Sequence, residues 1–360
     1  ALLITARADD RRLVTTTDDA GNLQPPKLNV FSLQESKGLS ADELATHLSP
    51  FKVQRATITA LVDAFEHAKT FGSLIQIPYA LKNHLAALPQ TLALVKQSGD
   101  MYATAAAEDF LPLVQQAQVL AMQFDAVVAN PPYMGNKFLS PILKSYLRDN
   151  FYGFEKDLFS AFMIRDLGLT KESGQLGFMS PFVWMFISSY EELRRHFIDN
   201  ATLTSLVQLE YSGFDGATVP ICAFTLSKQQ LVKFWGSYVR LSNFRGADQQ
   251  GPRTLEAIRN PSCGWFYTSK QEDFKKIPGC PIAYWVSQAV FDTFVKGAPV
   301  ETFGDVKRGM TTSDNKTFLR FWPEVSINKT FFHARNSAEA VQSGAKWFPY
   351  SKGGGYRKWY

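Results

Sequence analysis

The middle of the chain alternates between strand-like and helix-like segments, and this alternation restricts the fold more than any other feature of the sequence. Apolar runs typical of buried strands occupy residues 124–129, 175–181 and 204–210. The segments between them, 155–169 and 189–199, have the length and apolar spacing of helices. Because strands separated by helices of this length form parallel βαβ units, the sequence predicts an α/β fold with a doubly wound sheet.

The flanking regions add two strands and a helical insertion to this prediction. Residues 28–36 alternate between apolar and polar side chains, as a strand does. Residues 40–122 read as a helical insertion that opens with a capping-box pair, Ser40 and Glu43. Residues 211–228 predict a loop that leads into an antiparallel edge strand, because no helix precedes that strand.

The cysteines, histidines and hydropathy indicate a soluble protein of a reducing cytoplasm, with no metal and no membrane span. The three cysteines, Cys222, Cys263 and Cys280, include no CxxC pair, and the five histidines are scattered singly. No stretch approaches the ~18 apolar residues of a transmembrane helix. The first residues also lack the pattern of a signal peptide.

Positive charge is concentrated at the C-terminal end. Residues 301–360 hold ten Lys or Arg against five Asp or Glu, which equals the net charge of +5 of the whole chain. Basic side chains interleaved with aromatic rings suit contact with phosphates and bases, so we expect a nucleic acid to bind here. The residues assigned to this contact are Lys307, Arg308, Lys316 and Arg320. The alternative is a solvated basic face over an aromatic core.

The first strand-like run of the middle region ends in Asn130, Pro131, Pro132 and Tyr133. In a parallel sheet, residues at this position face the ligand. The exocyclic amine of adenine is a poor nucleophile because its lone pair is delocalised into the ring. The side-chain oxygen of Asn130 and the carbonyl oxygen of Pro131 can accept its two N–H groups and localise that lone pair.

The other features of this tetrapeptide fit the same task. Two consecutive prolines fix the backbone before the substrate arrives, and the ring of Tyr133 offers a face on which a base can stack. We therefore predict that Asn130–Tyr133 form a rigid site for a planar amine. The alternative is a polar turn that closes a strand, since Asn-Pro often begins a turn.

Residues 124–135 and 155–181 resemble motifs four to six of the amino-group DNA methyltransferases that use S-adenosylmethionine. More widely, the chain resembles the adenine-specific methyltransferases of BREX and phage-growth-limitation defence systems, which are related to type IIG restriction-modification enzymes. The segments that carry this wider resemblance are ALLITARADDRR, FGSLIQIP, DFKKIPGCPIAYWVS, GMTTSDNKTFLR and KWFPYSKGGGYRKWY. It implies methylation of adenine N6 at a defined DNA site, and other defence-system proteins as partners.

The resemblance also implies roles for individual residues. Asn130–Tyr133 match the family's catalytic motif, and Phe214 matches its second base-stacking aromatic, so the flipped adenine would lie between Tyr133 and Phe214. An ordinary core residue is the alternative for Phe214.

Four residues match the family's cofactor contacts. They are Gln34 and Glu35, at the end of the predicted strand 28–36, and Lys156 and Asp157, at the start of the motif-five helix. An exposed helix start explains the last two equally well.

The resemblance implies a partial Rossmann-like methyltransferase domain over residues 1–230, with the helical insertion at about 40–122. A connecting region at 231–300 and the start of a target-recognition domain at 301–360 would follow.

Three other functions are open. The same tetrapeptide would activate the amide of a protein glutamine or the amine of an RNA base. Asp19 followed by Glu35 and Lys37 loosely imitates a metal-dependent nuclease site. A non-catalytic DNA-binding module is the third.

The chain departs from the family at the cofactor. The glycine-rich loop that binds the methionine end of S-adenosylmethionine is absent, and the only dense glycines are Gly353–Gly355. We expect the chain to begin just after that motif and to be inactive by itself. It should bind S-adenosylmethionine weakly or not at all. Isothermal titration calorimetry measures this affinity, and tight stoichiometric binding would contradict the expectation.

Overall fold

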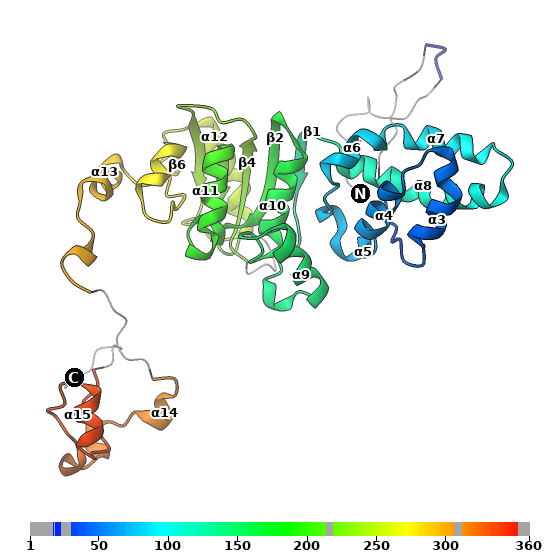
Figure 1. Cartoon of the computed structure of the whole chain (residues 1–360). Coiled ribbons are helices and arrows are strands. Elements are labelled where there is room, and N and C mark those ends of the chain that lie inside the picture. Colours follow the sequence, from blue (N-terminus) through cyan, green and yellow to red (C-terminus); the bar gives the residue numbers. More distant parts are fainter. Residues whose placement is uncertain (1–16, 18, 23–29, 214–218, 306–311, 352–360) are drawn as a thin grey trace. The chain divides into compact units, whose positions relative to one another are not determined.

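The chain folds into two compact units, residues 1–297 and 298–360. Within the part of the chain that is described, no helix is both long enough and apolar enough to cross a membrane. Figure 1 shows the computed structural model, which describes residues 17, 19–22, 30–213, 219–305 and 312–351.

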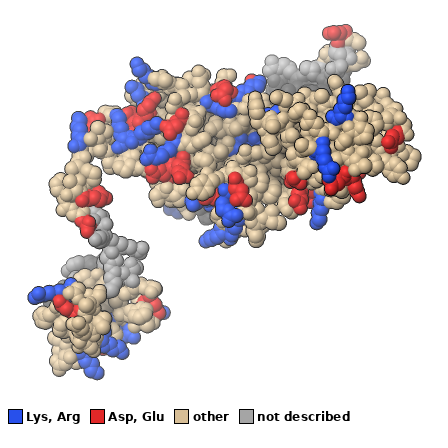
Figure 2. Space-filling view, in the orientation of Figure 1, with Lys and Arg blue, Asp and Glu red and all other residues tan. Residues whose placement is uncertain are grey.

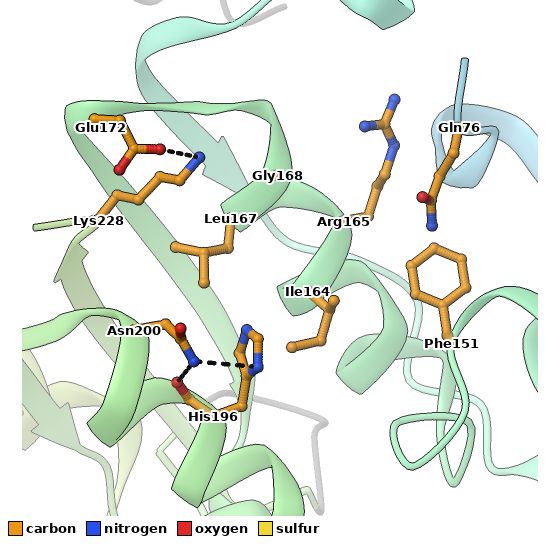
Figure 3. A pocket seen from close by; sticks show the side chains of 10 residues that line it. All are labelled: Gln76, Phe151, Ile164, Arg165, Leu167, Gly168, Glu172, His196, Asn200 and Lys228. Carbon is orange, nitrogen blue, oxygen red and sulfur yellow. Dashed lines mark hydrogen bonds and ion pairs between the residues drawn. The ribbon is translucent and has the colours of Figure 1, made fainter. Parts of the chain in front are cut away.

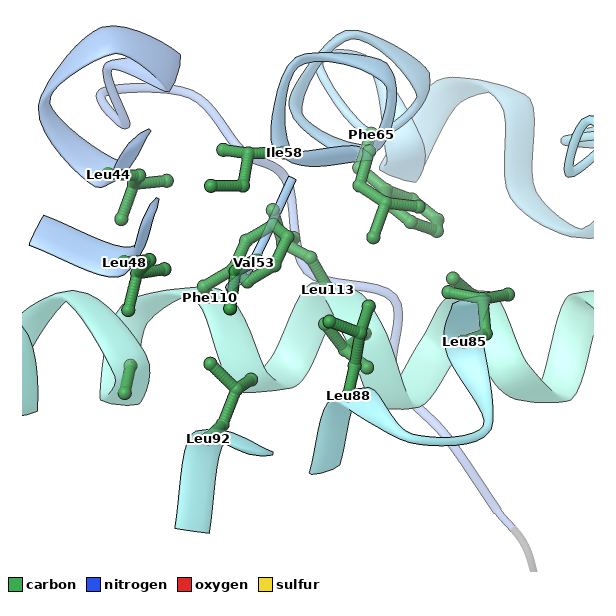
Figure 4. Close-up of a cluster of buried hydrophobic side chains, with 14 of the residues drawn as sticks. Leu44, Leu48, Val53, Ile58, Phe65, Leu85, Leu88, Leu92, Phe110 and Leu113 are labelled. Atoms are coloured by element: carbon green, nitrogen blue, oxygen red, sulfur yellow. The ribbon is translucent and has the colours of Figure 1, made fainter. Parts of the chain in front are cut away.

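A helical module precedes the sheet in the larger unit. Its elements are α3 (Ala41–Leu48), η1 (Ser49–Phe51), α4 (Arg55–Ala64), α5 (Ala68–Phe71), η2 (Gly72–Leu74), α6 (Tyr79–Leu85), α7 (Leu88–Lys96) and α8 (Met101–Ala121). Ser40 accepts a hydrogen bond from the backbone N–H of Glu43 and so caps α3, as the sequence predicts. Leucine, isoleucine and phenylalanine side chains from the other helices pack around α8 (Figure 4). This confirms the helical part of the predicted fold.

A mixed six-stranded sheet forms the rest of this unit. Its strands are β1 (Phe124–Ala129), β2 (Thr170–Pro181), β3 (Thr202–Gln208), β4 (Ile221–Ser227), β5 (Trp235–Arg240) and β6 (Phe266–Lys270). The spatial order is β1-β2-β4-β3-β5-β6. β1 pairs with β2, and β3 with β5, in parallel, whereas β4 is antiparallel to both β2 and β3, and β6 is antiparallel to β5. The carboxyl ends of β1, β2, β3 and β5 therefore share one edge of the sheet.

The helices around the sheet connect its strands. They are α9 (Pro141–Asn150), α10 (Leu158–Leu169), α11 (Glu191–Asn200), α12 (Ala247–Arg259) and α13 (Gln288–Lys296), with the short helices η3 (Asn136–Phe138), η4 (Phe182–Met185), η5 (Ser188–Tyr190) and η6 (Gln271–Lys276). α10 connects β1 to β2 and α11 connects β2 to β3, so the predicted strand–helix alternation and α/β class are confirmed.

The position of β4 corrects one prediction. The strand is antiparallel, as expected, but it lies between β2 and β3 and not at an edge. Phe224 pairs with Phe178 on one side and with Leu206 on the other. A connection without a helix predicts the antiparallel direction of the strand but not its place in the sheet. β4 is paired on both sides, and Cys222 and Phe224 are buried, as in an interior strand.

The predicted strand at residues 28–36 is also corrected. Residues 30–36 are not a strand. The side-chain amide of Gln116, in α8, accepts from the backbone N–H of Gln34 and donates to its carbonyl oxygen, both at 2.9 Å. Because a side chain supplies the two hydrogen bonds that a neighbouring strand would make, this segment attaches to the helical module.

The sheet continues beyond residue 230, into the region that the sequence left as a connection. β5 runs beside β3, and β6 pairs with β5. β2 is also longer than the predicted strand 175–181, because it begins at Thr170. A register shift absorbs the extra residues: Phe124 pairs with Thr170, and Ala126 pairs with Gln175.

The smaller unit contains only short elements within its described part. They are η7 (Val300–Thr302), α14 (Asn315–Phe318), η8 (Trp322–Glu324), η9 (Ile327–Lys329) and α15 (Ser337–Gln342). A single β-bridge joins Thr330 to Trp347. Large aromatic side chains, including Phe318 and Trp322, are exposed on its surface.

A buried arginine holds the helical module against the sheet. Arg165, in α10, is only 8% exposed. Its guanidinium donates to the carbonyl oxygens of Ser73 (2.9 Å), Ile75 (2.8 Å) and Leu120 (2.8 Å). Hydrogen bonds from a charged donor are stronger than neutral ones, so this single side chain fixes two segments of the module, the end of η2 and the end of α8.

The next residue, Asp166, is a buried acid. It is 5% exposed, and its Oδ2 atom has no hydrogen-bond partner in the described structure. Burial raises the pKa of Asp166 to about 7, although the charge of Arg165 favours the ionised form. The folded chain therefore keeps a proton on Asp166 that the unfolded chain loses near pH 4.

This difference predicts a pH-dependent gain in stability for Asp166→Asn. In the wild type, stability falls as the pH rises from about 4 to about 7, because the unfolded state releases the proton first. The amide has no proton to lose, so the advantage of the variant should widen over that range, by at most roughly 1.4 kcal/mol per pH unit, and then level off. Thermal unfolding at several pH values measures it. Asp109→Asn, at an exposed position of α8, is the control, and an advantage of Asp166→Asn that is independent of pH would contradict the assignment.

Candidate active site

The Asn130–Tyr133 tetrapeptide lies at the sheet edge where the parallel strands end. β1 ends at Ala129, which pairs with Phe178 of β2, and Asn130 follows directly. The side chain of Asn130 is exposed, whereas Pro131 is buried. Tyr133 is partly buried and packs against the apolar core of the sheet. The fold therefore presents the carboxamide to solvent on a rigid support.

A hydrogen bond connects the two functional side chains of the tetrapeptide. The hydroxyl of Tyr133 donates to Oδ1 of Asn130 at 2.8 Å. Burial raises the pKa of Tyr133, so the hydroxyl stays protonated as a donor. The bond orients Oδ1 of the Asn130 amide. A carboxamide oxygen has two lone pairs, so Oδ1 can still accept an N–H from a bound amine.

Asp157 anchors the segment that follows Tyr133. Its Oδ1 accepts from the backbone N–H of Met134 (3.1 Å) and of Phe159 (3.2 Å), so one carboxylate holds the loop and caps α10. The N–H of Leu158 also donates to the carbonyl of Met134, at 3.0 Å. Burial raises the pKa of Asp157, although backbone N–H groups favour its charged form.

The sequence recognised Asp157 as a helix start but gave no sign of its contact with Met134. The two residues lie 23 positions apart in the sequence, and the contact forms because the loop after β1 lies against the start of α10. Lys156 is exposed and pairs with Glu155 at 3.5 Å. The cofactor contacts assigned to Lys156 and Asp157 stay predictions.

The other predicted cofactor residues lie elsewhere in the larger unit. Gln34 and Glu35 belong to the segment attached to α8, and they do not end a strand of the sheet. Within the described residues, no hydrogen bond joins them to Asn130–Tyr133. The cofactor contacts assigned to Gln34 and Glu35 therefore stay predictions.

The predicted DNA-binding and base-stacking residues are only partly described. Phe214, Lys307 and Arg308 lie outside the described residues. Lys316 and Arg320 are exposed in the smaller unit, where Arg320 donates to the carbonyl oxygen of Lys316 at 2.6 Å. On the face shown in Figure 2, basic and acidic side chains are interspersed over the larger unit.

A separate hollow of about 450 Å³ lies at the opposite edge of the sheet (Figure 3). It contains the beginning of β2, at Glu172, and the residue after β4, Lys228, so it is remote from the carboxyl end of β1. Lys228 and Glu172 form an ion pair at 3.3 Å, and Asn200 donates to the carbonyl oxygen of His196 at 2.9 Å. This hollow lies at the amino edge of the sheet, where the carboxyl ends of the parallel strands are absent, so the tetrapeptide stays the candidate site.

Across the described ranges, no cluster of three or more His, Cys, Asp or Glu side chains could hold a metal ion. All three cysteines are free, and Cys222 and Cys280 are buried.

Comparison with known proteins identifies relatives of this chain. Residues 37–214 match the Eco57I restriction-modification methylase family. The adenine-specific methyltransferase BrxX of Escherichia coli O9:H4 (strain HS) is 36% identical, over 100% of this chain and 30% of its own length. The adenine-specific methyltransferase PglX of Lacticaseibacillus casei (strain Zhang) is 34% identical, over 69% of this chain and 21% of its own length.

These relatives confirm the family resemblance seen in the sequence, and the chain spans less than a third of the length of either. Among solved structures, a type I restriction-modification methyltransferase subunit from Streptococcus thermophilus matches with a TM-score of 0.34 and 13% identity. That match covers 48% of this chain and 44% of the other.

The anchoring role of Asp157 leads to a test. Asp157→Ala should lower the free energy of unfolding by about 1–2 kcal/mol, because it removes a helix cap together with the contact to Met134. It should also speed amide hydrogen exchange at Met134, measured by mass spectrometry or NMR. Ser140→Ala removes only the cap of α9 and should leave exchange at Met134 unchanged. Equal exchange at Met134 in the two variants would contradict the anchoring role.

Proposed function

Because the chain is a homologue of the adenine-specific methyltransferases BrxX and PglX, and carries an Eco57I-type methylase segment, we propose that the protein methylates N6 of adenine at a defined site in double-stranded DNA. The observation that carries the proposal is the exposed Asn130 side chain at the carboxyl end of β1, with its oxygen oriented by the hydroxyl of Tyr133.

The chain's own residues act on the target amine. Oδ1 of Asn130 and the carbonyl oxygen of Pro131 accept its two N–H groups and draw the nitrogen towards tetrahedral geometry. Pro131 and Pro132 fix the backbone in advance, so little reorganisation is needed when the base arrives. The exposed part of the Tyr133 ring supplies the surface on which the base stacks.

We propose S-adenosylmethionine as the cofactor, since it supplies the transferred methyl group in enzymes that the sequence resembles. The described residues do not make a complete site for it. Gln34 and Glu35 lie on the segment bound to α8, and the Asp157 oxygen Oδ1 is occupied by two backbone N–H groups. No catalytic step is therefore derived through the cofactor.

We assign DNA recognition to the smaller unit. Its sequence carries ten Lys or Arg against five Asp or Glu over residues 301–360, although the described residues, 298–305 and 312–351, hold five of each. Exposed aromatic side chains accompany them. Lys316 and Arg320 are the described candidates for phosphate contacts. Other defence-system proteins as partners, and a cytoplasmic location, belong to the same proposal.

Two other functions make different demands on the same residues. A methyltransferase that acts on protein glutamine would use Asn130 in the same way but would not need the basic smaller unit, whereas one that acts on an RNA base would use that unit to contact RNA phosphates. A non-catalytic DNA-binding module would need that unit alone. The order of preference among duplex DNA, RNA and protein as methyl acceptors separates these cases.

The full-length protein tests the assignment. With tritiated S-adenosylmethionine and unmodified duplex DNA, Asn130→Ala should lower the rate of methyl transfer at least 10²-fold, because it removes one of the two acceptors that activate the amine. Tyr133→Phe keeps the stacking ring and should lose less activity than Tyr133→Ala. Asn200→Ala, at the opposite edge of the sheet, is the control and should match the wild type. Wild-type activity in Asn130→Ala would remove the catalytic assignment.

A further inference from the structure

An arginine without an acidic partner ends strand β5. Arg240 is the last residue of β5, and its backbone N–H donates to the carbonyl oxygen of Trp265 at 2.9 Å. Within the described residues, its side chain makes no hydrogen bond and no ion pair. Its Nε atom is buried and unpaired, whereas the two Nη atoms are not buried. The described fold therefore leaves this guanidinium uncompensated, although buried polar atoms of native proteins are normally paired.

An aromatic ring supports the guanidinium from one face. Cζ of Arg240 lies 4.3 Å from the centre of the Trp285 ring. Trp285 is held edge-to-face by Tyr284, with ring centres 5.0 Å apart, and by Phe186, at 5.5 Å. A guanidinium that stacks on a ring keeps its N–H groups in its own plane, so the ring positions the cation and leaves those donors available to an anion.

The polar groups beside Arg240 are paired with each other. Gln208, at the end of β3, is the cross-strand neighbour of Arg240. Its Oε1 accepts from the hydroxyl of Tyr284 at 2.8 Å, and both residues are buried. Tyr284 also stacks on Tyr238 of β5, with ring centres 4.6 Å apart. The surroundings of Arg240 are therefore fixed before a ligand arrives, but they supply no negative charge.

Arg240 lies on the same row of the sheet as the groups beneath the Asn130–Tyr133 tetrapeptide. Arg240 pairs with Gln208 of β3, and Gln208 pairs with Cys222 of β4. Because side chains of directly paired residues project from the same face of a sheet, all three lie on one face. Tyr133 packs against the apolar cluster that contains Cys222. Arg240 and the tetrapeptide therefore share both a face and the carboxyl edge of the sheet.

The separation of the two positions suits a DNA duplex. Four inter-strand steps lead from β1 to β5, and at about 4.8 Å for each step they span roughly 19 Å. One helical turn of duplex DNA is longer, roughly 34 Å. A duplex that delivers an adenine to Asn130 can therefore place a backbone phosphate at Arg240.

We propose that Arg240 binds a phosphate of the DNA backbone within one helical turn of the target adenine. The inference rests on the proposed DNA methyltransferase function. The in-plane N–H groups of arginine match the oxygens of a phosphate, and the contact neutralises one backbone charge. Arg240 does not touch the reacting base. Its loss should therefore weaken the binding of DNA, and the salt dependence of that binding, without slowing methyl transfer from the bound complex.

The chain contains a matched control in Arg253 of α12. Its Cζ lies 4.9 Å from the ring centre of Phe244 and 5.5 Å from that of Trp265, so it is also an arginine beside aromatic rings. Its Nη1, however, pairs with the carboxylate of Glu256 at 2.7 Å. Replacing Arg253 removes a ring-supported guanidinium whose charge already has a partner. General effects of losing such a side chain should therefore appear in both variants.

The test compares Arg240→Gln and Arg253→Gln in the full-length protein. Fluorescence anisotropy gives the Kd for duplex DNA at several salt concentrations. Arg240→Gln should raise Kd about fivefold or more at about 0.1 M salt, and it should reduce the slope of log Kd against log salt by about 0.9, the contribution of one phosphate. Its kcat at saturating DNA should stay within about twofold. Arg253→Gln should keep the slope and bring Kd within about twofold of the wild type.

A second measurement locates the phosphate. The wild type first identifies a methylated adenine in duplex DNA. Neutral methylphosphonates then replace the phosphates within one turn of that adenine, one at a time. At one position the replacement should weaken binding of the wild type about threefold or more, and binding of Arg240→Gln by less than about twofold. If no position shows this difference, the phosphate contact is overturned.

The outcomes separate the two proposals. If the wild type methylates no adenine in duplex DNA, the proposed function fails and the inference fails with it. If the wild type is active but Arg240→Gln keeps the wild-type salt slope, or changes it only as much as Arg253→Gln does, only the phosphate contact is overturned. Arg240→Met is a second variant in case Arg240→Gln does not fold, because its thioether can pack on the Trp285 ring. It should lose the same part of the slope, and a wild-type slope in this variant would also overturn the contact.

Discussion

The direction of β4 is the constraint on which the rest of the sheet depends. β4 enters between β2 and β3 and runs against both of them. Two antiparallel steps restore the original direction, so β3 and β5 end at the same edge as β1 and β2. The loop after β1 and the loop after β3 therefore lie at the same edge of the sheet, although about 80 residues separate them in the sequence. An edge strand could not pair with both β2 and β3, so it would not set the direction of β3 relative to β2. The burial of Cys222 and Phe224 agrees with the interior position of β4.

Buried polar side chains hold the loops and modules around this sheet. Arg194, in α11, donates to the carbonyl oxygens of Trp184, Ile187 and Gly279 and so ties η4 and η5 to the segment before α13. Gln116 does the same for the segment around Gln34. Leaving any of these carbonyl groups buried and unpaired would cost about 1–3 kcal/mol. Each such side chain therefore favours the loop arrangement in which its carbonyl partners are paired.

The sequence predicted the elements that depend on local pattern and missed those that depend on distant partners. The segments that became β1, β3 and β4, and the helix α10, are apolar runs of strand or helix length bounded by polar or turn residues, so their existence follows from the sequence. Residues 30–36 have the same alternation, but Gln116 replaces a neighbouring strand. β5 and β6 were not recognised because β5 has glycine and serine within it and acquires its burial only beside β3.

The candidate site also combines features that the local sequence predicts with features that depend on distant residues. The tetrapeptide itself was recognisable, because the chemistry of Asn130 and the stiffness of two prolines are properties of the local sequence. The bond from Tyr133 to Asn130 and the anchoring of Met134 by Asp157 depend on side-chain directions and on the packing of β1 against α10.

The contact of Arg165 with the helical module has a consequence for evolution. The guanidinium donates to main-chain carbonyl oxygens, those of Ser73, Ile75 and Leu120. Within the described structure, none of its hydrogen bonds involves a side chain of the module. Substitutions at those three positions can therefore accumulate without changing the chemistry of the attachment. The surface of the module can diversify between lineages while its docking onto α10 stays the same.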